Sequence, residues 1–276
     1  MRKIDLILIV ALSFFFVATS TTKAREMSNN TTLSPKQQAI IPIAAFTATG
    51  KIDKLKIALN DGLDAGLVVN EIKEILVQMY AYAGFPRSLN GLGTFMAVLN
   101  ERKEKGIKDE TGKEAGPFPK DKTVLELGTE VQAKISGGPV KGPLFDFAPA
   151  IDEYLKKHLF GDIFGRDNLD FQSREIATIA ALSSLEGAES QLQAHFRIGM
   201  NVGLTETQLQ NLISVLETKV GTKESDRATS ILNTLLSTNK TTETESGLQE
   251  LCRNSFYVEM KILFYANGVF FHVIHS

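Results

Sequence analysis

The sequence has 276 residues, a net charge of −2, 43% hydrophobic residues and 22% charged residues. These values are ordinary for a globular protein, and the length allows one large domain or two small ones with a substantial core. They give no sign of a fibrous or disordered chain, and the nearly balanced charge argues against nucleic acid as a partner.

The N-terminal segment has the features of a secretory signal peptide. Arg2 and Lys3 precede an apolar run at residues 6–18, and small polar residues follow it. This order predicts a signal peptide over residues 1–24, cleaved on export, and a periplasmic or secreted protein. The alternative is an uncleaved membrane anchor, although the apolar run is shorter than the roughly 20 residues that a spanning helix needs.

An internal repeat is visible in the rest of the chain. The apolar positions and helix caps of residues 33–76 recur in residues 169–213, shifted by 136 residues at the start and by 137 further on. Gly66 and Gly203 occupy equivalent places, where a helix is expected to end and the chain to reverse. Because the apolar spacing is helical in both copies, we expect an all-α fold made by tandem duplication of one helical unit.

The first repeat is expected at residues 33–104 and the second at residues 148–237, each with four helices. Thr205 starts the third helix of the second copy with a capping box. The first copy has Val68 at that position, so its third helix is expected to begin later, at Asn70.

Two segments lie outside the repeats. Residues 105–147 are expected to be a linker, with a short helix at residues 124–135. Residues 238–276 form an atypical tail, and its aromatic-rich part at residues 252–276 is either a docking strand or hairpin, or an artefact of an altered reading frame.

Two stretches resemble the carboxymuconolactone decarboxylase family in its duplicated form. One is residues 70–92, which contain the sequence Tyr-Ala-Gly-Phe-Pro, and the other is residues 160–209. The resemblance covers most of residues 33–237 and implies the helical unit of the alkylhydroperoxidase D-like superfamily. That family includes decarboxylases, partners of thiol peroxidases and members without an assigned activity, so the resemblance leaves the reaction open.

The resemblance also implies one composite site. Members of the family commonly carry a histidine eight residues before the turn glycine, which here is His195 before Gly203. The first copy has Ala58 at the matching position, whereas the second copy lacks the tyrosine that the first copy has at Tyr82. Sites in this family form where helices of neighbouring units meet, so we expect the two halves to build one site together.

His195 is the candidate catalytic residue because an imidazole can give or take a proton near neutral pH. The candidate substrate-binding residues are Tyr82, Arg174, Arg166 and Gln191, since arginine binds carboxylates well and tyrosine can donate a hydrogen bond. Each has a structural alternative. His195 would then pack at the edge of the core with a hydrogen-bonded neighbour, and Arg174 with Glu175 would form an ion pair that fixes one helix to the next.

Other chemistries have less support. Cys252 is the single cysteine of the sequence. Thiol peroxidase activity is therefore disfavoured, because the branch that resembles alkylhydroperoxidase D uses a CxxC pair. No metal is expected, since His195 has no histidine or carboxylate three or four residues further along its helix. No cofactor is expected either, because no phosphate-binding loop or dinucleotide motif occurs.

The sequence thus predicts an exported lyase or isomerase that needs no cofactor and acts on a small carboxylate or lactone, with His195 as the proton-transfer residue. The alternative is a non-catalytic protein that uses the same fold to bind a small ligand or to assemble. Its expected partners are a small molecule and further copies of the chain, with no nucleic acid and no metal.

Overall fold

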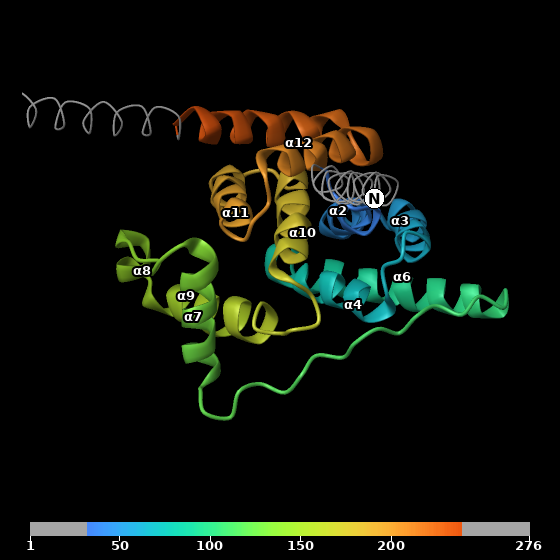
Figure 1. The fold of residues 1–276 in the computed structure, drawn as a ribbon, viewed down its shortest axis with the longest axis horizontal. Coiled ribbons are helices and arrows are strands. Elements are labelled where there is room, and N and C mark those ends of the chain that lie inside the picture. The colour runs from blue at the N-terminus through green and yellow to red at the C-terminus, as the bar shows by residue number, and fades with distance from the viewer. Residues whose placement is uncertain (1–31, 239–276) are drawn as a thin grey trace, which may run out of the picture. The chain divides into compact units, whose positions relative to one another are not determined.

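The computed structural model describes residues 32–238, which contain helices and connecting segments and no strand (Figure 1). The expected signal peptide and the tail from residue 239 onward lie outside the described residues. The chain divides into two compact units after Thr229, and the contacts discussed below lie within the first unit. None of the described helices is long and apolar enough to cross a membrane.

The elements of the first repeat are α2 (Pro35–Thr49), α3 (Ile52–Asp64), α4 (Val69–Gln78), α5 (Tyr80–Ala83) and α6 (Phe85–Glu104). The connecting segment contains α7 (Val124–Ser136) and α8 (Pro143–Phe147), and the second repeat opens with α9 (Pro149–Tyr154) and the π-helix η1 (Leu155–Ile163). The second repeat contains α10 (Phe171–Ser184), α11 (Glu189–Asn201), α12 (Glu206–Val215), the π-helix η2 (Leu216–Val220) and a last helix at residues 222–238.

The two repeats have the same helices at a constant spacing. Helices α11 and α12 have the lengths of α3 and α4 and begin 137 residues after them. Gly66 and Gly203 follow α3 and α11 with φ values of 94° and 98°, which a side chain would disfavour. The expected all-α tandem duplication is confirmed.

Side chains cap three of the helices as the sequence predicts. Ser34 accepts a hydrogen bond from the backbone of Gln37, Asp170 accepts one from Ser173, and Thr205 begins α12 with a capping box. These caps satisfy N–H groups that have no partner inside the helix, and so they fix where each helix starts.

The expected later start of the third helix, at Asn70, is wrong. Helix α4 begins at Val69, directly after Val68, although valine has no group that could cap it. Instead the carbonyls of Glu110 and Thr111 accept the N–H groups of Val69 and Asn70, both at 2.9 Å. A loop far along the sequence therefore replaces the missing side-chain cap, which local sequence could not reveal.

Helices α2 and α10 pack along each other at the centre of the fold (Figure 1). Every residue at positions 40–48 of α2 and 173–183 of α10 is buried. Helix α2 is apolar on nearly all of its faces, which explains its central place, whereas α10 is buried together with its charged residues Arg174 and Glu175. Helices α4 and α5 of the first repeat pack on α10, and α12 and η2 of the second repeat pack on α2. Side chains of both repeats therefore meet on α10.

Helix α7, expected at residues 124–135 within the linker, is confirmed and packs along η1. The two backbones touch at Gly128, where a Cβ would lie 1.7 Å from the carbonyl oxygen of Lys156. Side chains of α7 and η1 form a hydrophobic cluster with Ile198 of α11, and Tyr82 packs against this cluster. Helices α7 and η1 thus cover the place where Tyr82 of α5 meets α11.

Candidate active site

His195 lies on the buried face of α11 and is 8% exposed. Its Nδ1 atom is 2.7 Å from Oε2 of Glu175, a fully buried residue of α10. The second repeat alone therefore supplies a buried pair of imidazole and carboxylate.

Glu175 is a fully buried carboxylate of the central helix α10. It follows the N-cap Asp170 by five residues and belongs to the buried stretch of α10. Its Oε2 atom contacts His195, whereas Oε1 is buried and has no hydrogen-bond partner among the described residues. Because buried polar atoms are almost always paired, Oε1 is open to a ligand or a water molecule.

Tyr82 reaches this pair from the first repeat. Its ring meets the imidazole of His195 edge-on, with centroids 5.6 Å apart and planes at 79°. The hydroxyl is buried and makes no hydrogen bond of normal geometry within the described chain. Burial, and after it the negative charge of Glu175, raises the pKa of Tyr82 far above its usual value. The hydroxyl therefore stays protonated and is available as a donor.

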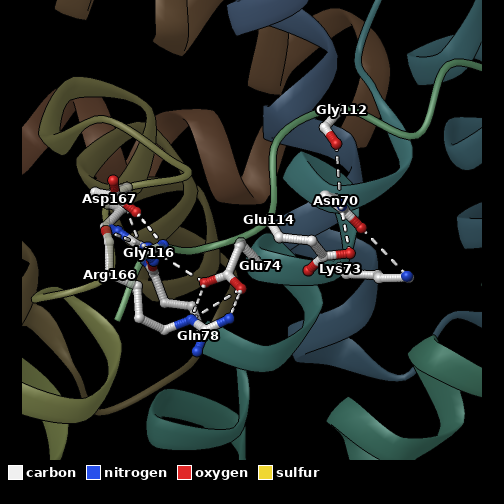
Figure 2. Close-up of polar contacts among 10 residues, drawn as sticks. Asn70, Lys73, Glu74, Gln78, Gly112, Glu114, Gly116, Arg166 and Asp167 are labelled. Carbon is white, nitrogen blue, oxygen red and sulfur yellow. Dashed lines mark hydrogen bonds and ion pairs between the residues drawn. The ribbon is translucent and has the colours of Figure 1, made fainter. Parts of the chain in front are cut away.

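A second polar cluster lies beside this pair and is centred on Glu74 of α4 (Figure 2). Arg166 donates to both carboxylate oxygens of Glu74 at 2.8–3.0 Å, and Arg174 donates to Oε2 at 3.3 Å. Burial pushes the pKa of Glu74 up, but the hydrogen bonds of Arg166 and the charges of both arginines bring it below its ordinary value. The pKa of Arg174 is lowered by burial. Both arginines are thus bound to a carboxylate of the protein itself.

Gln78, one turn after Glu74, ties α4 to α10. Its Nε2 atom donates to the carbonyl of Arg174 and to the hydroxyl of Thr178, both at 2.9 Å, and its Oε1 atom accepts from Arg174 at 3.2 Å. Arg174 is fully buried, and its Nε atom has no partner among the described residues. These bonds fit the structural alternative for Arg174, an ion pair that fixes neighbouring helices, with Glu74 as its partner.

The non-helical segment at residues 105–123, here called the strap, runs past this cluster (Figure 2). The amide of Asn70 donates to the carbonyl of Gly112 and to the carboxylate of Glu114 at 3.2 and 3.0 Å. Further along, the N–H of Gly116 donates to Asp167 at 2.7 Å. Since Asp167 is adjacent to Arg166 in sequence, the strap helps to hold the segment that binds Glu74.

The predicted site residues therefore fall into three groups. His195 and Tyr82 lie together. Arg174 and Arg166 surround Glu74, and Gln191 is exposed and accepts a hydrogen bond from its neighbour Ser190. Sequence reasoning missed Glu175 as the partner of His195, although a carboxylate in the middle of an apolar helix was a signal that could have identified it.

An open cavity of about 450 Å³ lies nearby, and its lining includes none of His195, Glu175 and Tyr82. It lies between α7, the start of α10 and the end of α11, and its lining includes Ile135, Phe171 and Val202. These three residues also belong to, or pack against, the hydrophobic cluster that Tyr82 contacts. The cavity and Tyr82 are therefore linked only through this hydrophobic cluster.

The other half of the duplication provides an internal comparison. The positions equivalent to Glu175 and His195 are Ala39 and Ala58, and the position equivalent to Tyr82 is Lys219. The same unit thus folds with no buried imidazole or carboxylate at these places. The three polar side chains are consequently not required by the fold.

Within residues 32–238, no three histidine, cysteine, aspartate or glutamate side chains gather in a way that would hold a metal ion. The model of the carboxymuconolactone decarboxylase family matches residues 15–95 and 149–233, once for each repeat and over more than half of the chain. The chain belongs to the carboxymuconolactone decarboxylase family.

A curated member of this family is similar to one part of the chain. The 4-carboxymuconolactone decarboxylase of Acinetobacter baylyi (strain ATCC 33305 / BD413 / ADP1) is 32% identical over 89 residues, which are 32% of this chain and 66% of that protein. The match thus spans slightly less than two thirds of the relative.

Proposed function

We propose that this family member is a lyase or isomerase that acts without a cofactor on a small carboxylate or lactone, with His195 as its proton-transfer residue. The observation that carries this proposal is the buried contact of 2.7 Å between His195 and Glu175. Both polar residues stand where the other half has alanine, at Ala58 and Ala39. A buried ionisable pair that the fold does not need is a strong candidate for chemistry.

Glu175 determines which nitrogen of His195 faces a substrate. An ionised carboxylate only accepts hydrogen bonds, so Nδ1 carries the proton that is shared with Glu175, and Nε2 is left for the ligand. Nε2 then takes a proton from a substrate when the ring is neutral and gives one when the ring is charged.

A decarboxylation uses these groups as follows. The bond between the substrate carbon and its carboxylate breaks, the electron pair moves onto a conjugated carbonyl as an enolate, and carbon dioxide leaves. The Tyr82 hydroxyl donates a hydrogen bond to the enolate oxygen, and Nε2–H of His195 gives its proton to the carbon. The same groups would perform an isomerisation by removing a proton at one carbon and returning it at another.

The name of the Acinetobacter relative supports this class of reaction, since it describes removal of a carboxylate from a lactone. We further propose that the protein is exported, on the signal-peptide features of residues 1–24. Its substrate would then be a small carboxylate or lactone found outside the cytoplasm.

We also propose a homo-oligomer. Two neighbouring short helices expose large apolar or aromatic side chains, each 45–87% exposed: Leu144 and Phe147 on α8, and Ile151 and Tyr154 on α9. A second copy of the chain would cover this apolar surface.

The proposal is tested by incubating the purified mature protein in D₂O with 4-carboxymuconolactone and a panel of small oxo acids and lactones. The expected result is release of carbon dioxide, or isomerisation, with deuterium at the carbon that receives the proton. Binding of these compounds without turnover would favour the alternative, a ligand-binding protein. N-terminal sequencing of the exported form tests the signal peptide separately.

A further inference from the structure

The charges around His195 balance one another. On α10, Glu175 contacts the imidazole, and Arg174 is bound to Glu74, which also holds Arg166. With a neutral imidazole, these two carboxylates and two guanidinium groups cancel.

The other elements packed near His195 add no cation that faces it. Tyr82 on α5 is neutral, because its pKa lies far above the usual value. Helix α7 contributes apolar side chains to the adjoining cluster, and its Lys134 is exposed and lies over the ring of Phe171. Arg197, on α11 itself, is exposed. Among the described residues, a bare anion at His195 thus finds no unpaired positive charge.

The hydrogen-bonding pattern of the His195 ring also argues against the binding of a bare anion. If Glu175 is ionised, Nδ1 of His195 carries the shared proton, and a neutral ring presents only a lone pair at Nε2. A carboxylate cannot accept a hydrogen bond from a lone pair. It can bind only if Nε2 also carries a proton. If that extra proton instead resides on Glu175, the complex still contains one proton more than the free protein and the free carboxylate together.

We propose that a carboxylate ligand binds at His195 together with one proton, so that the site takes up an acid and not a bare anion. This rests on the proposed function, because it concerns the same site and the same class of substrate. The complex then already holds Nε2–H, the proton donor that the protonation step needs.

The experiment is calorimetric titration of the whole protein with acetate, in buffers of different ionisation enthalpy, from about pH 5 to 8, where histidines change charge. The expected uptake is about one proton per acetate at the upper end. There the affinity falls about tenfold per pH unit, since one proton is linked to binding. Acetamide, which is uncharged, is expected to bind without proton uptake.

Glu175→Gln is the decisive variant. A glutamine amide can turn its NH₂ group toward Nδ1, which makes the neutral ring with a proton on Nε2 available. Acetate binding by this variant is expected to show no proton uptake and no dependence on pH. Circular dichroism checks whether the variant is folded. If the variant does not fold, the titration of the wild-type protein still tests the proposal.

Nitrogen NMR of the imidazoles locates the proton, with His158 as a matched control. His158 has the same 2.7 Å contact with a carboxylate, that of Asp162, but its side chain is 54% exposed. Acetate is expected to move the Nε2 signal of His195 and to leave that of His158 in place.

Three results would overturn the proposal: acetate binding without proton uptake, equal uptake by Glu175→Gln, or no response of His195 to acetate. Turnover without proton uptake would refute this inference and leave the proposed function standing. Proton uptake on acetate binding by a protein that shows no turnover would support this inference and refute the proposed function.

Discussion

The phenol ring of Tyr82, from the first repeat, stands edge-on to the imidazole of His195, from the second, with ring centroids 5.6 Å apart. Neither repeat contains both residues, because Lys219 and Ala58 occupy the equivalent positions. The two repeats therefore each contribute one residue to this contact, which is the composite candidate site.

Tyr82→Phe is expected to lower turnover at least tenfold, because a positioned donor to a developing oxyanion typically contributes that much or more. The ring contact with His195 remains, and the lost hydroxyl makes no hydrogen bond of normal geometry among the described residues, although the Thr178 side chain lies close enough to lower its pKa. Stability is therefore expected to be unchanged or slightly higher. Steady-state kinetics and thermal unfolding check the two parts.

Tyr80→Phe is the matched control. The Tyr80 hydroxyl is also buried without a partner, but its ring stacks on Phe85, with centroids 4.4 Å apart, and lies near His158. Turnover by this variant is expected to equal that of the wild type. An equal loss in the Tyr80 and Tyr82 variants would show that the Tyr82 hydroxyl has no special role.

Glu74→Gln is expected to destabilise the fold by about 3 kcal/mol, because it leaves the buried guanidinium of Arg174 without its counter-charge. Chemical denaturation measures the change. Glu71→Gln is the control, since Glu71 pairs with the half-exposed Lys36, and we expect a change within about 1 kcal/mol. Equal effects of the two substitutions would show that the Glu74 cluster does not hold the repeats together.

The pH dependence of stability gives a separate prediction for Glu74. Its folded-state pKa lies below the ordinary value of 4.5, so its ionised form stabilises the native state. That contribution is fully present above pH 4.5 and is lost as the pH falls through the lowered pKa. Denaturation curves across this range should show a smaller loss in Glu74→Gln than in the wild type. Parallel curves would contradict the assignment.

Gly128→Ala is expected to destabilise the protein by about 3 kcal/mol or more, because the new Cβ would lie 1.7 Å from the carbonyl oxygen of Lys156 and would force α7 away from η1. Gly93→Ala, in α6, meets nothing within 4 Å and is expected to stabilise by about 0.5–1 kcal/mol. Thermal unfolding of both variants tests whether α7 and η1 depend on this close approach. A Gly128 variant as stable as the wild type would show that they do not.

The local sequence was sufficient to predict the helices of the repeated unit. Capping side chains such as Ser34 and Thr205, and the turn glycines Gly66 and Gly203, determine local backbone geometry, so their positions indicate where helices begin and end. The duplication then followed from the repetition of these signals. The start of α4 could not be predicted in this way, because its cap comes from a loop about 40 residues further along the chain.

The composite site was predictable only in part. His195 and Tyr82 were brought together by the resemblance and by what each copy lacks, and the structure places them in contact. The roles of Glu175 and Glu74 depend on which helices cross, and this is decided by packing over long sequence separations. For the same reason, the arginines expected to bind substrate could not be recognised as partners of Glu74.

The central claim is most directly tested by the turnover of His195→Gln beside that of His158→Gln. Glutamine at position 195 keeps an N–H donor for Glu175 but cannot transfer a proton. We expect the His195 variant to be folded and to lose at least a hundredfold in turnover, the usual size of an acid–base contribution. The His158 variant should keep the wild-type rate. A folded His195→Gln protein with wild-type turnover would contradict the assignment of His195 as the proton-transfer residue.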